Sequence, residues 1–255
     1  KRLALGGGAQ ISDEWAFRLD GSYQEEDGFA DRAEETREVL AGSLLYQPSA
    51  DLSVRFSMDY ADVDAAAFWG TPLIDGKASR SHRQNNYNFA DGKVVFEDLW
   101  SRMHIEWNLS DNITFRNDTY ILDASREWQN LEEYSHNAIT NQIDRAFYLG
   151  IVHEEDQIGT RFDFLIDTEV AGMANSLSIG AEANDIELDY LNNFSTGGFG
   201  VGDSVPISDF NPGATPAGSI PTILDYQTET QQAAIFIDNV LQLSDQLSLV
   251  LGGRY

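Results

Sequence analysis

Residues 231–255 read QQAAIFIDNVLQLSDQLSLVLGGRY, two apolar segments that meet at Ser244-Asp245-Gln246. In the second segment every other residue from Leu247 to Tyr255 is apolar or glycine, and Ser248 and Arg254 stand among the residues between them. This period of two is that of a β-strand whose two faces meet different surroundings. Ser and Asp are residues that tight turns favour. The stretch therefore predicts a β-hairpin.

The same alternation recurs at 15–24, 52–60 and 161–170. One face of each segment is apolar, as at Phe17, Phe56 and Phe164. The opposite face carries charges of both signs, at Arg18, Asp20, Arg55, Asp59, Asp163, Asp167, Glu169 and Arg254. Mixed charges in a row suit a hydrated lumen, because a dry core would require a buried partner for each.

Less regular apolar segments near 1–11, 37–47, 93–109, 113–127, 174–190 and 226–243 bring the expected number of strands to ten. No helical period is sustained. Each segment reaches the roughly 9 to 11 residues that a tilted strand needs to cross a bilayer, whereas soluble strands are typically about 5 to 6 residues long.

The connections between these segments alternate between short and long. Tight turns are expected at Ser12-Asp13, 48–51, 110–112, Met173-Ala174 and 244–246, and long polar loops near 25–36, 63–92, 128–157 and 191–225. Short turns at one end and long loops at the other are typical of outer-membrane barrels. A soluble antiparallel sandwich is the alternative, and it has no physical reason for this asymmetry.

Aromatic residues stand near the ends of several segments, where an interfacial girdle would lie. They are Trp15, Tyr23, Tyr46, Tyr60, Trp107 and Tyr255.

Two stretches resemble the TonB-dependent siderophore receptors. Residues 231–255 are similar to that family's mid-barrel hairpin, in which an aromatic strand with an Asp-Asn pair turns at Asp and returns as Leu-Gly-Gly-Arg-Tyr. Residues 17–24, 47–54 and 58–60 resemble its early barrel hairpins, and Gly70-Thr71-Pro72-Leu73 resembles the loop that follows. The resemblance implies an all-β, antiparallel up-and-down transmembrane β-barrel of about 22 strands closed by a plug. Residues 1–255 would hold roughly strands two to eleven of that barrel domain.

Composition narrows the class of protein. The net charge of −26 argues against binding to nucleic-acid phosphates, and the absence of Cys excludes disulfides and thiolate sites. The chain opens at Lys1-Arg2 inside an apolar run, so we expect it to be a piece of a longer protein. It contains no plug sequence and no TonB box, so energy coupling follows from the resemblance alone.

No pattern typical of an enzyme is present, and we expect no catalytic residue, metal or cofactor. The four His residues are scattered, and His153-Glu154-Glu155-Asp156 fits no known set of metal ligands. Acidic clusters such as Glu25-Glu26-Asp27 are expected to be solvated, or to reach lipopolysaccharide phosphates through calcium.

The long loops hold the candidate ligand-binding residues, since binding residues concentrate on loops held by a rigid scaffold. An iron chelate offers flat apolar surface and often negative charge, which aromatic side chains and a few cations suit. The candidates are Phe68, Trp69, Arg80, Arg83, Tyr87, Phe89, Trp128, Tyr134, Phe194 and Phe199. The alternative for each aromatic residue is that it only packs the loops together.

The expected function is active import of a ferric siderophore or related iron chelate across the bacterial outer membrane. Expected partners are that chelate, outer-membrane lipid and lipopolysaccharide, and TonB acting through the plug region. The ligand could instead be haem, a cobalamin or an oligosaccharide. A passive porin and a soluble β-rich binding module remain the alternative functions.

Overall fold

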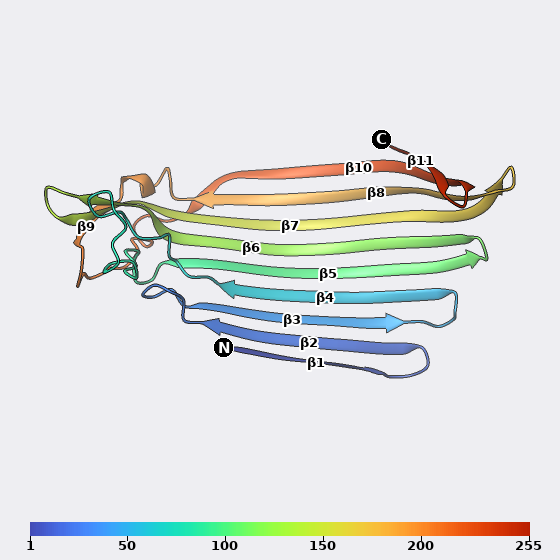
Figure 1. Ribbon diagram of the computed structural model, residues 1–255, viewed down its shortest axis with the longest axis horizontal. Coiled ribbons are helices and arrows are strands. Elements are labelled where there is room, and N and C mark those ends of the chain that lie inside the picture. Colours follow the sequence, from blue (N-terminus) through green and yellow to red (C-terminus); the bar gives the residue numbers. More distant parts are fainter.

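The computed structural model describes all 255 residues as a single antiparallel sheet with loops gathered at one end (Figure 1). The strands are β1 (Arg2–Gln10), β2 (Trp15–Glu26), β3 (Glu35–Tyr46), β4 (Leu52–Asp64), β5 (Lys93–Ser110), β6 (Ile113–Asn137), β7 (Gln142–Val170), β8 (Met173–Asn192), β9 (Gly202–Pro206), β10 (Ile223–Ser244) and β11 (Leu247–Arg254). One short 3-10 helix, η1 (Gly198–Gly200), lies in the loop before β9.

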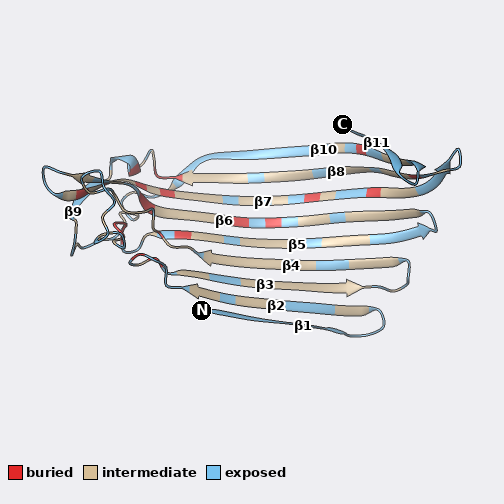
Figure 2. Cartoon of the chain, in the orientation of Figure 1, coloured by how far each residue is buried: buried red, intermediate tan, exposed pale blue.

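Ten strands follow one another across the sheet in chain order, from β1 to β8 and then β10 and β11, while β9 pairs with β7. The ten expected strands and the all-β antiparallel fold are confirmed. Apart from the turn at 138–141 between β6 and β7, the tight turns lie at one end of the sheet and the long connections at the other (Figure 1). The sheet is open, and β1 and β11 at its two edges are exposed along their whole length (Figure 2). No helix in the structure is long and apolar enough to span a membrane.

Two boundary predictions were wrong. Residues 128–157 are not a long loop, because β6 and β7 run on through them and only 138–141 connects the two strands. The turn expected at Met173-Ala174 lies instead at Ala171 and Gly172, whose φ angles are 54° and 78°. Two successive residues of positive φ form the turn type that joins twisted antiparallel strands most tightly.

The extension of β7 loses its period of two at Phe147, which explains why it looked like a loop. Phe147 has a φ of 56°, so the buried positions change from Ile143 and Arg145 before it to Tyr148 and Gly150 after it. A left-handed residue inside a strand turns the following side chains onto the other face. The alternation that marks a strand in the sequence is therefore interrupted here.

The pairing register places the apolar side chains of every strand on one continuous face. Leu19 lies opposite Gly42 and Gly42 opposite Met58, while further along the sheet Phe162 lies opposite Ala181 and Ala181 opposite Ile235. We call this the apolar face; it carries Phe17, Leu19, Phe56, Met58, Phe164 and Ile237 among others. The six predicted girdle aromatics all point to it, and Trp15 and Tyr46 stack at 4.4 Å next to the turns.

The opposite face holds all eight charged residues that the sequence places there, and we call it the charged face. Polar contacts link neighbouring strands on it: Arg116 Nη2 forms an ion pair with Asp163 at 2.6 Å, Arg102 forms one with Asp59, and His104 Nδ1 is hydrogen-bonded to Asp118 at 2.7 Å. Asp163 also accepts a hydrogen bond from Ser178. Most of these charges therefore find partners within the face.

Candidate ligand-binding site

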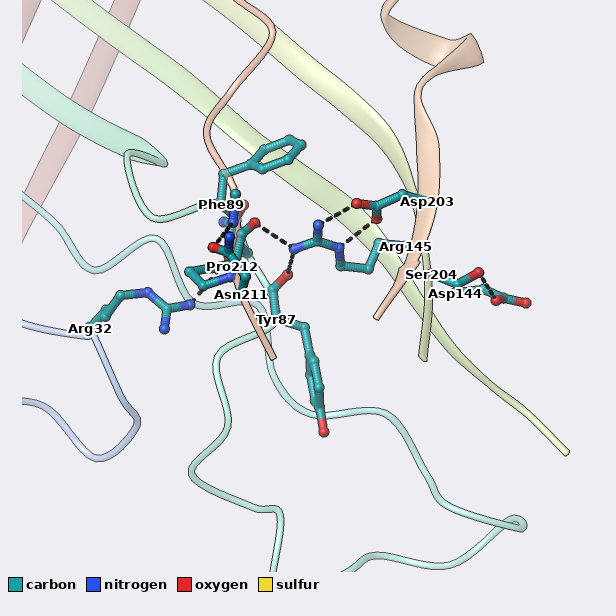
Figure 3. Close-up of polar contacts among 11 residues, drawn as sticks. Arg32, Tyr87, Phe89, Asp144, Arg145, Asp203, Ser204, Asn211 and Pro212 are labelled. Atoms are coloured by element: carbon teal, nitrogen blue, oxygen red, sulfur yellow. Dashed lines mark hydrogen bonds and ion pairs between the residues drawn. The ribbon is translucent and has the colours of Figure 1, made fainter. Parts of the chain in front are cut away.

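The long loops pack into one cluster beside the ends of β6 and β7, and Arg145 of β7 lies at its centre (Figure 3). The side chain of Arg145 is 1% exposed and forms a two-pronged ion pair with Asp203 of β9, at 2.7 and 2.5 Å. Its third nitrogen donates to the carbonyl oxygens of Tyr87 and Pro212, both at 2.9 Å. The guanidinium lies 5.1 Å from the ring centre of Phe89. One cation thus joins a strand to the loops at 65–92 and 193–222.

Buried asparagine side chains tie the same loops to the backbone. Asn88, with no exposed surface, accepts hydrogen bonds from the amides of Phe89 at 2.9 Å and Leu131 at 3.0 Å, and donates to Ala67 O at 3.1 Å. Arg32, from the connection between β2 and β3, donates to the carbonyl oxygens of Asn86 and Asn88. Because these buried backbone groups are paired within the protein, the cluster holds a defined conformation.

An aromatic core fills the space around Tyr87. Its ring stacks on Phe210 with centres 4.9 Å apart, and Tyr134 lies 6.2 Å away. The hydroxyl of Tyr87 donates to Ile207 O at 2.8 Å. Burial raises the pKa of both Tyr87 and Tyr134 above the ordinary tyrosine value, because a charged phenolate would be poorly solvated there.

The ten predicted site residues separate into three groups and one further residue, Trp128. Tyr87 and Phe89 are buried in the loop cluster, and Tyr134 is half-buried with its hydroxyl bonded to Leu131 O. Phe194 and Phe199 stack at 4.5 Å beside Phe147, and Phe199 is 50% exposed. Trp69 and Arg80 are exposed, Phe68 is half-buried, and Arg83 lies 5.6 Å from the ring centre of Phe29. Trp128 lies on β6, outside any loop.

The surroundings of Trp128 reveal a feature that sequence reasoning missed. A row of five rings crosses five neighbouring strands on the charged face, and we call it the aromatic row. Neighbouring ring centres lie 5.6, 5.2, 4.9 and 4.8 Å apart. In order, the rings belong to Phe96, Trp128, His153, Tyr190 and Tyr226.

Most apolar side chains of the apolar face form a band across the middle of the strands, and we call this band the apolar belt. The aromatic row lies nearer the loop end of the sheet than this belt. At its level the apolar face carries acidic side chains among a few apolar ones: Glu97, Glu127, Glu154 and Asp189, each adjacent in sequence to a ring of the row, lie beside Val95, Val152 and Leu191. The rings are half-buried, and Tyr226 is 48% exposed. The row therefore belongs to the part of the wall that projects past the apolar belt.

The charge next to the row is balanced. Arg126 lies 5.5 Å from the ring centre of Phe96, and its guanidinium is already bonded to Asp98 at 2.5 Å and to the carbonyl of Ser125 at 2.8 Å. Burial, and secondly Arg126, lower the pKa of His153, so the imidazole is neutral near pH 7. The row offers aromatic surface with no free cation.

No local sequence feature marks the row, because each ring stands on a different strand. Only the register brings them together, as when His153 pairs with Tyr190 and Tyr190 with Tyr226. No group of three or more His, Asp or Glu side chains lies in a position to hold a metal ion.

The fold is that of the β-barrel wall in outer-membrane receptors for ferric siderophores, and the predicted resemblance is confirmed at this level. No protein-family model and no curated protein matches the chain. The similarity is therefore to solved structures.

Three of these structures show the extent of the likeness. The pyoverdine outer membrane receptor FpvA of Pseudomonas aeruginosa PAO1 superposes with a TM-score of 0.83 at 14% identity, covering 99% of this chain and 38% of its own. BauA, the ferric preacinetobactin receptor of Acinetobacter baumannii, gives 0.81 at 14%, covering 98% and 39%. The ferric-catecholate import receptor Fiu of E. coli K12, in its open form, gives 0.79 at 15%, covering 99% and 42%. The chain thus spans about two fifths of each receptor.

Proposed function

We propose that this chain is part of the barrel wall of an outer-membrane receptor that imports a ferric siderophore with energy supplied through TonB. The observation that carries the proposal is the two-faced sheet, apolar on one side across ten strands and charged on the other. A sheet with an apolar outer band and a polar interior is what a bilayer requires of a barrel. The similar proteins are receptors for pyoverdine, ferric preacinetobactin and ferric catecholate, and this supports the choice of substrate.

In this proposal the apolar face contacts lipid and the charged face borders the watery interior. Phe56 is 47% exposed on the apolar face, and Arg55 is its neighbour on the charged face. Spin labels at the two positions of the full-length protein in lipid test the assignment. A label at position 56 should be relaxed by oxygen dissolved in the bilayer, and one at 55 by a water-soluble nickel chelate. The reverse pattern would refute it.

Capture of the chelate takes place at the loop end of the wall. Trp69, Arg83, Phe194 and Phe199 are accessible there and are the loop residues proposed to meet the ligand first. Tyr87 and Phe89 act from within the cluster, where their packing fixes the shape of the loops. Lipid and lipopolysaccharide surround the wall, and TonB acts through a plug region outside this chain.

Uptake of radioactive ferric siderophore by cells tests the function. Cells that lack the gene and are complemented by the full-length protein should accumulate iron, and should stop when TonB is deleted or the proton gradient is collapsed. A passive channel is the second candidate, favoured by the charged face. It would give uptake that persists without energy, together with swelling of proteoliposomes in small sugars. That outcome would identify the protein as a porin and refute the receptor assignment.

A further inference from the structure

We propose that the aromatic row is the surface that holds the ligand during entry, and that the ligand is a chelate with aryl rings and little net negative charge. The inference rests on the proposed function and narrows its substrate class. It makes an aliphatic chelate and a highly anionic chelate the poorer substrates.

The first argument is the continuity of the aromatic surface. Trp128, His153 and Tyr190 follow one another with ring centres 5.2 and 4.9 Å apart, and Tyr190 is nearly parallel to Tyr226, with 16° between the ring planes. Aromatic rings bind one another at offset-stacked or edge-to-face separations of about 4.5–7 Å. A flat aryl group can therefore bind at several points along the row without losing its contacts.

The second argument is that the row differs from the rest of the charged face. Lower on this face two aromatic rings have cations as partners: Arg161 lies 4.3 Å from the ring centre of Phe236, and Arg102 lies 5.9 Å from that of Trp100. The stretch from Trp128 to Tyr226 has no such cation. Its rings are partly exposed and no cation covers them, whereas Phe236 beneath Arg161 is only 7% exposed.

The third argument is position. The row lies outside the apolar belt, so its rings are not needed to anchor the wall in lipid, and carboxylates occupy the other face of the same strands. Phe96 and Trp128 stand directly below the buried Val94 and Asn130, which face the loop cluster end. A ligand released by the loops would meet the row next.

The charge of the surroundings selects among aryl chelates. The nearby Arg126 is neutralised by Asp98, and Glu155 stands on the same face two residues from His153. The whole chain carries a net charge of −26. A trianionic chelate would meet repulsion without a compensating cation, and its charge would be costly to desolvate. A neutral aryl chelate avoids both costs.

A matched set of metal complexes tests the inference on the full-length receptor in detergent. The probes are chromium(III) tris(benzohydroxamate) and tris(acetohydroxamate), which are uncharged and differ only in phenyl against methyl, and trianionic chromium(III) tris(catecholate). Chromium(III) exchanges ligands slowly, so each complex stays intact during equilibrium dialysis. The receptor should bind the benzohydroxamate complex about tenfold tighter than the acetohydroxamate complex, and the trianionic complex weakest.

Substitutions locate the binding surface. Trp128→Leu and Tyr190→Leu should each reduce benzohydroxamate binding to the level of acetohydroxamate, whereas Trp128→Phe, which keeps a ring, should retain most of it. Trp107→Leu on the apolar face is the control and should change nothing. Heat-modifiable mobility on gels checks that each variant is folded.

The outcomes separate this inference from the proposed function. Three results would overturn the aromatic site. The receptor could bind the two hydroxamate complexes equally tightly, or it could bind none of the complexes although it supports uptake in cells. The Leu variants could also be folded and bind normally. Tight binding of the trianionic complex would overturn the charge selection. Loss of energy-dependent uptake in cells, with aryl binding intact, would overturn the transport function and leave the site standing.

Discussion

Replacing Arg145 by Met tests whether one buried cation holds the loop cluster together. The substitution keeps an unbranched side chain beside Phe89 but removes every polar contact. The two-pronged pair with Asp203 and the hydrogen bonds to Tyr87 O and Pro212 O are all lost.

The expected cost follows from what each partner does afterwards. Asp203 is 50% exposed, so water replaces the guanidinium there and the loss is about 1 kcal/mol. The carbonyl of Tyr87, a residue with no exposed surface, loses its partner at a cost of about 1–3 kcal/mol, and Pro212 loses a similar bond in a partly buried position. Local unfolding of the cluster should therefore become easier by about 3 kcal/mol, which is roughly a hundredfold in population.

Hydrogen exchange followed by mass spectrometry measures this locally in the full-length protein in micelles. Peptides from 84–90 and 202–213 should exchange roughly a hundredfold faster in Arg145→Met, while peptides from β3 and β4 should be unchanged. Arg18→Met is the matched control. Arg18 is exposed and pairs with Asp20 of its own strand, so the same substitution there should leave exchange of the loop peptides unchanged.

Two results would refute this reasoning. Loop exchange within a few-fold of the wild type would mean that the carbonyl bonds contribute little. Equal acceleration in β3 and β4 would mean that Arg145 stabilises the sheet as a whole and not the loops.

Three further predictions concern the sheet, the pH dependence and the isolated chain. Gly159→Val should lower the free energy of unfolding in micelles, measured by urea titration, by about 1–3 kcal/mol, because a Cβ at 159 would lie 2.5 Å from the Tyr120 ring. Gly7→Val is the control and should leave this free energy unchanged, because a Cβ at 7 would have nothing within 4 Å. Because the pKa of Tyr87 is raised, its contribution to the stability of the loop cluster is complete below pH 10.0, the ordinary pKa of tyrosine, and is lost as the pH rises above that value. Proteolysis of the loops should therefore become faster above pH 10.0, and the increase should be smaller in Tyr87→Phe. Residues 1–255 alone should aggregate through the unpaired edges of β1 and β11, and a monodisperse soluble monomer in gel filtration would contradict this.

The strands could be predicted because their two faces differ in polarity. Arg55 and Phe56 are adjacent in sequence and lie on opposite faces, and the same alternation along β2, β4, β7 and β11 is visible without any structure. In the proposed barrel, a bilayer on one side and water on the other would impose a strict period of two. At the end opposite the loops, the tight turns were equally visible wherever Ser, Asp, Asn or Pro formed them, whereas the turn at 138–141, which Asn137 and Asn141 help to form, was missed.

The loop cluster could not be predicted, since its contacts join distant parts of the chain. Arg145 and Asp203 are separated by 58 residues, and nothing near either residue indicates its partner. The extension of β7 was hidden for a local reason, the left-handed Phe147. Aromatic residues here were correctly expected to matter, but the sequence does not distinguish Tyr87, buried in the cluster, from Trp69 on its surface.

The aromatic row shows how strongly a site in a barrel wall depends on register. Ala171 and Gly172 form the turn before β8 with no Asn or Asp to mark it, so the sequence suggested Met173-Ala174 instead. That turn would keep every side chain on its face but move β8 four residues along β7, which would put Phe194 opposite His153 in place of Tyr190. The composition of both faces would be unchanged and the row would be broken. A small insertion in a turn can therefore abolish a ligand surface in such a wall while leaving its fit to the membrane intact.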